Sequence, residues 1–396
     1  NTALLSDYFV KSTKKNSDGM ISNVICNSAK QGLIPQREYF DKDIANSDNT
    51  NGYYIIESND FVYNPRKSAD APYGPISSYQ YPEAGIVSPL YLCFRAKREI
   101  NPLYFEWYFR SSTWHRYIYM SGDSGARHDR VSIKDDVFFA MPINVPSAKE
   151  QEKISLFLDV IERRIETQRT LVETLKKYKR GLSDTLFDRT AQSPSCKIVK
   201  LGDAFELLQN NTFSRDDLTT NPSSVQNIHY GDVLVKYGAV ANISEYTPPY
   251  IKPTINLQKF VATSYLRDGD IVFADTAEDY SVGKATEIAG ANGLAVLSGL
   301  HTIPCRPLMK FHPMYLAYYF NSSLFRRQIY PLVQGTKVSS ISKGELVKTS
   351  VYAPTEREQR RIASMLYLLD LRITFEEKTV NALTNTRTAL LQQLFI

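Results

Sequence analysis

The sequence predicts an α+β protein in which two mixed α/β globular domains are separated by two long helices, pairing as an antiparallel coiled coil with pseudo-two-fold symmetry. The first supporting observation is a repeat: Pro146 to Phe187 aligns without a gap on Pro354 to Phe395, 208 residues later. The second is an apolar heptad pattern in both copies. The third is a looser correspondence between the segments that precede them. Solenoid repeats are about 20 to 50 residues long, so this longer period indicates a duplicated module.

Each long segment is predicted to start with a capping box, Ser147 with Glu150 in one copy and Thr355 with Glu358 in the other. This spacing satisfies the free N–H groups of a first helical turn. The heptad seam of the first copy consists of Ile154, Leu158, Ile161, Ile165, Gln168, Val172, Leu175, Lys179, Leu182 and Leu186. The seam of the second consists of Ile362, Leu366, Leu369, Ile373, Glu376, Val380, Leu383, Arg387, Leu390 and Leu394.

Polar residues interrupt both seams at the same two places, which suggests a register. If the helices run antiparallel with Gln168 opposite Arg387, then Lys179 lies opposite Glu376 and the other layers are apolar. Sliding by one heptad would bury each polar group against an apolar side chain, at a cost on the order of 1 to 3 kcal/mol. In the alternative, each helix packs on its own domain and the polar residues face water. The separation of Lys179 from Glu376 distinguishes the two.

The globular parts are predicted to be mixed, with a strand bias. The expected strands are rich in β-branched and aromatic residues: Gly52 to Ile56, Phe61 to Tyr63, Gly85 to Phe94, Asp232 to Lys236, Asp270 to Ala274 and Ala295 to Ser298. Helices are expected over Pro102 to Tyr117 and Pro313 to Gln328, each with Pro near its first turn. The segment Arg189 to Ser195, which contains Pro194, is the expected hinge after the first long helix.

Length and composition fit this plan. A chain of 396 residues can form two domains of about 150 residues plus helical spacers. The net charge of +5 permits a nucleic-acid partner without requiring one. The four cysteines lie far apart and form no CxxC pair, which is typical of a reducing compartment. No signal peptide or membrane-spanning apolar run is apparent, so we expect a cytoplasmic protein.

Catalytic motifs are nearly absent from the sequence. It has no GxxxxGK[ST] phosphate loop and no HExxH, and its five histidines lack metal-ligand spacing, so neither a metal nor a bound cofactor is predicted. Thr247-Pro248-Pro249-Tyr250 resembles the Asn/Asp-Pro-Pro-Tyr/Phe loop of adenine methyltransferases. However, Thr replaces the required amide or carboxylate and no FxGxG loop precedes it. A turn at a strand edge is therefore the favoured interpretation.

Taken together, the chain resembles the specificity subunit of type I restriction-modification systems. The resemblance rests on the P-[ST]-x-x-E-Q-x-x-I opening of each long helix, on the Leu5-x-Asp7-x-Phe9 and Leu201-x-Asp203-x-Phe205 starts of the two domains, and on the alternating order of domains and helices. It covers essentially the whole chain. It implies a target-recognition domain 1 over residues 1–146, spacer helix 1 over 147–188, target-recognition domain 2 over 189–354 and spacer helix 2 over 355–396. Because the chain begins just before the first motif, we expect any lead-in to be short or trimmed.

The resemblance also implies a function. Each recognition domain would read one half of a bipartite DNA site, and the helices would act as a spacer and as a docking surface for two methyltransferase subunits. Those subunits would methylate adenine at N6 with S-adenosylmethionine, and motor-nuclease subunits can join them. The chain itself would be a non-catalytic DNA-binding subunit. In the proposed register Ile154, Leu158, Ile362 and Leu366 lack a helical partner, so we expect them to pack against the recognition domains or the methyltransferase.

The candidate DNA-binding residues are polar or basic side chains on predicted loops, since base edges are read by paired donors and acceptors and phosphates by cations and hydroxyls. In the first domain they are Ser28, Lys30, Gln31, Arg66, Lys67, Tyr73, Arg127, His128 and Arg130. In the second they are Lys236, Tyr237, Lys284, Gln334, Thr336, Lys337 and Ser340. The alternative for each is an exposed, solvated loop residue.

Two other functions remain open at this stage. A self-contained DNA methyltransferase would bind S-adenosylmethionine without a partner. A two-domain protein scaffold would present acidic or apolar loop faces in place of basic ones.

Overall fold

The computed structural model describes residues 2–39, 50–122, 129–335 and 337–395. The chain forms two compact units, which are described separately. Unit 1 comprises Asn1–Thr170 and Lys378–Ile396, and unit 2 comprises Leu171–Glu377. Each unit therefore contains a globular part together with one end of each long helix. The secondary structure is α+β, as the sequence predicts.

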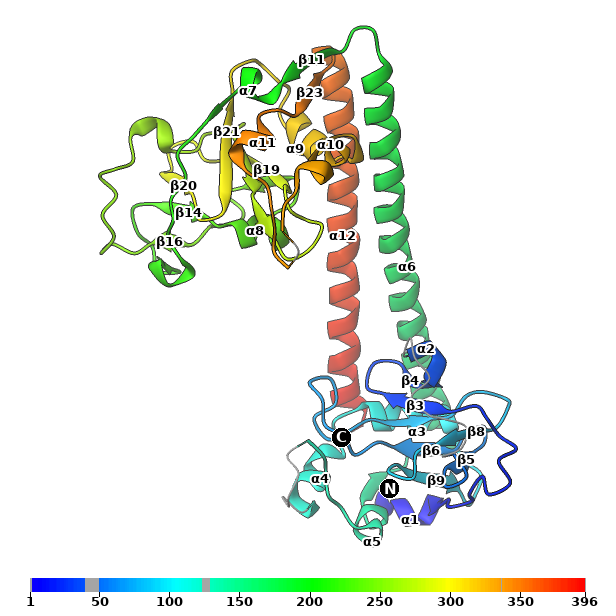
Figure 1. Cartoon of the computed structure of the whole chain (residues 1–396). Coiled ribbons are helices and arrows are strands. Elements are labelled where there is room, and N and C mark those ends of the chain that lie inside the picture. The colour runs from blue at the N-terminus through cyan, green and yellow to red at the C-terminus, as the bar shows by residue number, and fades with distance from the viewer. Residues whose placement is uncertain (1, 40–49, 123–128, 336, 396) are drawn as a thin grey trace. The chain divides into compact units, whose positions relative to one another are not determined.

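The two long helices are α6 (Ala148–Gln192) and α12 (Glu356–Leu394), drawn in green and red in Figure 1. At the start of α6 the backbone N–H of Ser147 donates to the Glu150 carboxylate at 3.0 Å, and the Glu150 N–H donates to the Ser147 hydroxyl at 3.4 Å. Helix α6 continues through Gln192, so it extends into the segment expected to be a hinge. It ends there because Pro194 lacks an N–H and cannot continue a helix.

Unit 1 contains short strands and helices around an aromatic core. Its elements before α6 are β1 (Thr2–Leu4), α1 (Leu5–Tyr8), β2 (Phe9–Lys11), β3 (Ile25–Ser28), β4 (Gly32–Pro35), α2 (Gln36–Tyr39), β5 (Tyr54–Ile56), β6 (Phe61–Tyr63), β7 (Ile76–Ser78), β8 (Gly85–Val87), β9 (Leu92–Ala96), α3 (Pro102–Arg110), α4 (His115–Ser121), α5 (Asp135–Phe139) and β10 (Pro142–Asn144). The largest described sheet has the order β2-β9-β6-β7, and β3-β4, β5-β8 and β1-β10 form separate pairs.

Unit 2 follows the same order of elements with additional strands. They are β11 (Lys197–Lys200), α7 (Leu201–Ala204), β12 (Phe205–Leu207), η2 (Arg215–Asp217), β13 (Leu218–Thr219), β14 (Gln226–Ile228), α8 (Tyr230–Val235), β15 (Val240–Asn242), β16 (Tyr250–Ile251), η3 (Ala262–Ser264), β17 (Ile271–Ala274), β18 (Thr276–Ala277), β19 (Ala285–Ala289), β20 (Val296–Ser298), β21 (Thr302–Pro307), α9 (Tyr315–Phe320), α10 (Ser323–Ile329), η4 (Tyr330–Leu332), β22 (Ser339–Ser340), α11 (Lys343–Leu346) and β23 (Ser350–Ala353). The main sheets are β12-β21-β17-β19-β15 and β13-β16-β14-β20.

Several sequence-based element predictions were wrong. The strand expected over Gly85 to Phe94 is divided into β8 and β9, and the helix expected over Pro313 to Gln328 is divided into α9 and α10. Asp232 to Lys236, expected to be a strand, lies largely in helix α8. Val233 is fully buried whereas Val235 is 87% exposed, a difference that suits a helix because residues i and i+2 share one face only in a strand. The helix expected over Pro102 to Tyr117 is broken into α3 and α4.

The break after α3 has a counterpart after α9, and a serine accompanies each. The Ser111 hydroxyl donates to the Tyr108 carbonyl and the Ser322 hydroxyl to the Tyr319 carbonyl, both at 2.6 Å. Such local side-chain bonds compete with the helical pattern. After the turn, Trp114 and Phe325 enter the two cores.

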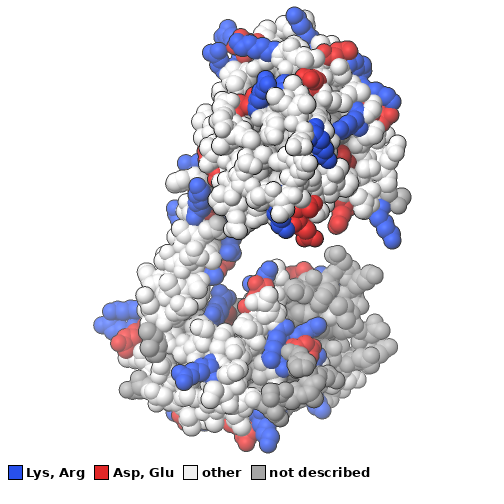
Figure 2. Space-filling model, turned by 90° about the vertical axis from the view of Figure 1, so that its left-hand side faces the viewer, with Lys and Arg blue, Asp and Glu red and all other residues white. Residues whose placement is uncertain are grey.

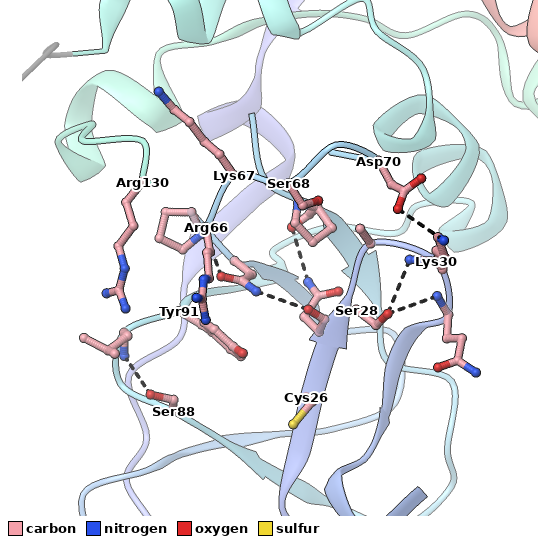
Figure 3. Close-up of a pocket in the computed structure, with 17 residues that line it drawn as sticks. Cys26, Ser28, Lys30, Arg66, Lys67, Ser68, Asp70, Ser88, Tyr91 and Arg130 are labelled. Atoms are coloured by element: carbon pink, nitrogen blue, oxygen red, sulfur yellow. Dashed lines mark hydrogen bonds and ion pairs between the residues drawn. The ribbon is translucent and has the colours of Figure 1, made fainter. Parts of the chain in front are cut away.

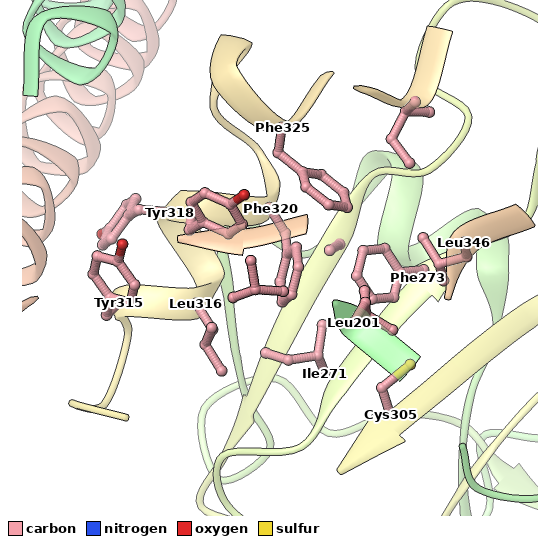
Figure 4. Close-up of a cluster of buried hydrophobic side chains, with 14 of the residues drawn as sticks. Leu201, Ile271, Phe273, Cys305, Tyr315, Leu316, Tyr318, Phe320, Phe325 and Leu346 are labelled. Carbon is pink, nitrogen blue, oxygen red and sulfur yellow. The ribbon is translucent and has the colours of Figure 1, made fainter. Parts of the chain in front are cut away.

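The cores explain why the last residues of both long helices match. In unit 1, the Phe395 ring lies 5.4 Å from that of Tyr104 and 5.8 Å from that of Tyr108. In unit 2, the Phe187 ring lies 6.0 Å from Tyr315 and 5.8 Å from Tyr319. Figure 4 shows part of the unit 2 core, where Phe320 and Phe325 of α9 and α10 lie near Phe273 of β17. Each long helix thus places a phenylalanine, at or near its C-terminal end, against two tyrosines of α3 or α9.

The four apolar residues expected to lack a helical partner pack as predicted against the globular parts. Leu158 is fully buried in the core of unit 1, and Ile154 packs against that core. Ile362 and Leu366 are fully buried in the core of unit 2.

Charged contacts between α6 and α12 differ from the predicted ones. In unit 2, Lys179 pairs with Asp370, which lies six residues before Glu376. In unit 1, Arg387 Nη1 lies 2.6 Å from a carboxylate oxygen of Glu162, which lies six residues before Gln168. The seam pattern did not predict these two ion pairs, which occupy equivalent positions of the repeat. The Asp370 side chain is 34% exposed, whereas that of Glu376 is only 5% exposed. An ion pair of Lys179 with the more exposed Asp370 therefore avoids the cost of desolvating the lysine ammonium group fully. The complete register stays a prediction.

Candidate nucleic-acid interface

A groove in unit 1 brings together most of the residues predicted to bind DNA there. Its volume is about 830 Å³, and Figure 3 shows the side chains that line it. Six predicted residues contribute: Ser28, Lys30, Gln31, Arg66, Lys67 and Arg130. They come from three segments that are far apart in the sequence, namely the β3–β4 turn, the loop after β6 and the segment before α5.

The β3–β4 turn is held by its own serine. The Ser28 hydroxyl accepts from the backbone N–H of Lys30 at 3.3 Å and of Gln31 at 3.4 Å. The turn closes at Gly32, whose φ of +70° favours glycine. This geometry leaves the Lys30 and Gln31 side chains at the groove edge and exposed.

The other wall joins two distant loops by backbone pairing. Arg66 and Arg130 form an antiparallel bridge, and the Lys67 N–H donates to the Asp129 carbonyl at 2.8 Å. The Asn64 amide donates to the Asn27 carbonyl at 3.1 Å, which ties this loop to β3. In Figure 3, Arg66 and Arg130 lie on the side of the groove near Tyr91, and Lys30 and Asp70 lie on the other.

The groove carries an excess of positive charge. It is lined by Lys30, Arg66, Lys67 and Arg130, whereas Asp70 is its one acidic residue among the described part of the chain. Asp70 lies 3.5 Å from Lys30, and both side chains are more than half exposed, so this pair is weak. The Arg130 Nε is buried and finds no acceptor among the residues that the structure describes. A guanidinium N–H without an acceptor, at the edge of a groove, can donate to a phosphate oxygen or to an acceptor on a base edge.

The remaining candidates of unit 1 lie elsewhere. Tyr73 packs against the core, with its ring 4.9 Å from that of His115, so it does not line the groove. Arg127 and His128 lie outside the described residues.

In unit 2 the candidates divide among three places. Tyr237 is only 2% exposed and belongs to a buried core cluster, so its prediction as a surface residue was wrong. Helix α8 causes this burial, since the backbone N–H of Tyr237 donates to the Asp232 carbonyl and turns the ring inward. Lys236 remains exposed, 5.8 Å from the Tyr237 ring centroid. The Lys284 ammonium donates to the Leu234 carbonyl at 2.7 Å, in a separate groove.

The third place is the loop from Gln334 to Ser340. These two residues exchange backbone hydrogen bonds of 2.9 and 2.8 Å, and β22 pairs with β18. Gly335 has a φ of +101°, and a Cβ there would lie 2.0 Å from the Val338 carbonyl oxygen. The loop is therefore a tight hairpin on which Lys337 is exposed. Thr336 lies outside the described residues.

Sequence reasoning missed a row of aromatic rings beside this hairpin. The His229 and Tyr230 rings lie 4.6 Å apart, and those of Tyr230 and His301 lie 5.3 Å apart. His301 Nδ1 lies 3.4 Å from the hydroxyl of Thr276 on β18. Burial lowers the pKa of His229, which favours the neutral ring at neutral pH. In the sequence, the adjacent residues His229 and Tyr230 were the one signal of this aromatic row. His301 is far from them in the sequence and is brought beside them by folding.

Basic and acidic side chains are interspersed on the face shown in Figure 2, so no single continuous field dominates that face. The candidate DNA-binding sites are therefore local grooves and not a broad basic face. Thr247 to Tyr250 leads into β16, which pairs with β13 and β14, so it lies at a strand as predicted. Among the described residues, no cluster of three or more metal-ligating side chains occurs, and no helix has the length and apolar character needed to cross a membrane.

The fold defined by these units is that of the specificity subunits of type I restriction-modification systems, and the likeness extends over the full chain. A chain from a structure of complex assembly and conformational transition in the type I R-M system aligns with a TM-score of 0.61 at 16% identity, covering 100% of this chain and 97% of that one. The HsdS subunit from Thermoanaerobacter tengcongensis aligns with a TM-score of 0.53 at 16% identity, covering 100% and 96%. The S subunit from M. genitalium aligns with a TM-score of 0.53 at 13% identity, covering 100% and 96%.

The sequence matches no protein-family model. It also matches no curated protein. The likeness is thus carried by the fold.

Proposed function

We propose that this chain is the DNA-specificity subunit of a type I restriction-modification complex, and that it acts without catalytic groups or a cofactor of its own in the cytoplasm. The observation that carries the proposal is the basic groove of unit 1, in a chain whose whole length has the fold of specificity subunits. The hairpin bearing Lys337 and the adjacent rings of His229, Tyr230 and His301 are the corresponding candidates in unit 2. Because the two sets of side chains differ, the two half-sites should differ as well.

The long helices would set the distance between the half-sites. The 45 residues of α6 correspond to a rod of roughly 68 Å at 1.5 Å per residue. One turn of B-DNA is about 34 to 36 Å, so such a rod can separate two readers by more than a turn. A rigid spacer would then define the number of unread base pairs in a bipartite site.

Both long helices also present exposed apolar side chains at equivalent places of the repeat. Phe157 is 51% and Val160 64% exposed on α6, and Met365 is 38% and Leu368 64% exposed on α12. Position 157 corresponds to 365 and position 160 to 368. Repeated apolar patches suit two copies of one partner. We propose that each patch docks one methyltransferase subunit, which would supply S-adenosylmethionine and N6-adenine methylation; motor-nuclease subunits can join this assembly.

Replacing Val160 and Leu368 with Asp should weaken methyltransferase assembly, because each change places a charge in an apolar contact. We expect co-purification to fall at least ten-fold, with an unchanged melting temperature for the isolated chain. The matched control is Met20→Asp, at an exposed apolar residue of unit 1 outside the long helices and outside the groove. Equal loss with the control would argue against docking at these patches.

The proposed function is tested by co-expressing the chain with a methyltransferase subunit encoded beside it and mapping modified adenines across the host genome. We expect methylation at one bipartite motif with a constant gap, and none when either protein is omitted. Methylation without this chain, or binding of S-adenosylmethionine by this chain alone, would contradict it.

A further inference from the structure

A second groove, of about 460 Å³, lies wholly within unit 2. It is formed where the stretch of α6 from Lys179 to Ser183 approaches α9 and α10, the turn before β19 and the connection between α8 and β15. Four basic side chains line it: Lys179, Arg180, Lys284 and Arg326. No acidic residue among the described part of the chain belongs to its lining.

Lys179 is the member of this set with a carboxylate partner, since it pairs with Asp370. Lys284 donates to the Leu234 carbonyl, and Arg326 donates to the carbonyls of Val282, at 2.6 Å, and Tyr280.

Asp279 acts on Arg326 electrostatically, but its carboxylate is exposed and accepts from the Ser281 N–H at 2.8 Å. Arg180 is exposed and has no acidic partner among the described residues. The groove therefore has positive charge that its own side chains do not neutralise.

The positive charge of Lys284 is energetically unfavourable because its ammonium group is partly removed from water. Its side chain is partly buried, and burial lowers the pKa of its ammonium group. A neutral donor would satisfy the Leu234 carbonyl equally well, so the hydrogen bond alone does not require a lysine. A bound anion would offset the desolvation of the ammonium group.

Two further features favour an anion with several oxygens. Gly238 and Ala239 line the groove, and the described part of the chain provides no acceptor for the backbone N–H of either residue. The Arg326 guanidinium lies 5.2 Å from the ring centroid of Tyr330, which is 50% exposed, and it donates to the backbone carbonyl of Tyr280, which is 86% exposed. Their rings could contact a sugar or base attached to the anion.

We propose that the groove of Arg180, Lys284 and Arg326 binds a phosphate group, carried either by the DNA backbone or by a small phosphate ester. Amide N–H groups and flexible cations together surround the tetrahedral oxygens of phosphate. The proposal rests on the proposed DNA-recognition role where the phosphate belongs to DNA.

The test uses calorimetry of the full chain with inorganic phosphate, with chloride added to keep the ionic strength constant. Lys284→Gln retains a donor for Leu234 and removes the charge, and Arg180→Gln changes an exposed residue that carries little folding risk. We expect each variant to weaken phosphate binding about ten-fold. The control, Lys310→Gln, removes an exposed lysine outside the groove and should bind as the unmodified chain does.

A second titration with the cognate duplex, in the complex with its methyltransferase, distinguishes the source of the phosphate. If inorganic phosphate does not bind but both variants weaken DNA binding and lower its salt slope by about one, the groove holds the DNA backbone. Unchanged affinity of both variants for phosphate and for DNA would overturn the proposal. A loss of DNA binding in Arg66→Ala, with neither DNA binding nor phosphate binding changed in Lys284→Gln, would overturn the groove while leaving the recognition role intact. If phosphate binding depends on Lys284 but the complex does not bind DNA, the result would support the phosphate site and contradict the DNA-recognition role.

Discussion

Replacing Arg66 and Arg130 together with Ala should reduce the affinity of the assembled complex for its DNA site by on the order of 100-fold or more. The two guanidinium groups lie on paired backbone segments at one side of the unit 1 groove, and Arg130 Nε is buried without an acceptor among the described residues. A good bidentate contact to a base is worth roughly 1 to 3 kcal/mol, so two such contacts exceed the effect of a general loss of charge. Titration of a labelled duplex at several salt concentrations measures both the affinity and the salt slope.

The matched control replaces Lys97 and Arg98 with Ala. Both are exposed residues of unit 1 outside the groove, and their loss changes the net charge by the same amount. We expect the control to retain nearly full affinity for the cognate site. Equal effects of the two double variants would mean that charge alone, and not the groove, determines binding.

Replacing Phe187 or Phe395 with Ala should destabilise the unit that contains it by about 3 to 5 kcal/mol. Both side chains are essentially fully buried, and each ring contacts two tyrosine rings at or near the C-terminal end of a long helix. A loss of this size is a large part of the roughly 5 to 15 kcal/mol that stabilises a typical domain. Urea unfolding followed by circular dichroism measures the change in midpoint.

Phe375→Ala provides the control, because Phe375 lies on α12 but is 62% exposed. Its replacement should change the midpoint little. If Phe375→Ala were as damaging as Phe395→Ala, burial of the Phe395 ring against the two tyrosines would not explain the loss, because alanine itself favours a helix. Phe395→Leu, which retains much of the apolar volume, should lie between the two.

The helices, the repeat and several strands could be predicted from sequence because their signals are local. Ser147 and Glu150 define the start of α6 by their spacing alone, and Pro194 limits its end. Strand β6 matches its predicted bounds, since Phe61 to Tyr63 are apolar residues that favour strands. Asp60 and Asp270 also match across the repeat, and each forms an ion pair with an arginine of a neighbouring strand, Arg95 or Arg306.

Tertiary structure decided the features that depend on residues far apart in the chain. Lys179 pairs with Asp370, which lies outside the heptad seam, so a seam pattern does not reveal this pair. Tyr237 is buried because α8 forms where the composition favoured a strand.

The duplicated sequence by itself therefore determined the α+β plan, the two capped helices and the basic segments that were candidates for binding DNA. Only folding brought Lys30, Arg66 and Arg130 to one groove and placed Lys284 in another. The physical reason is that caps and heptads act within a few turns of one helix, whereas a groove requires loops closed by backbone pairing between distant strands.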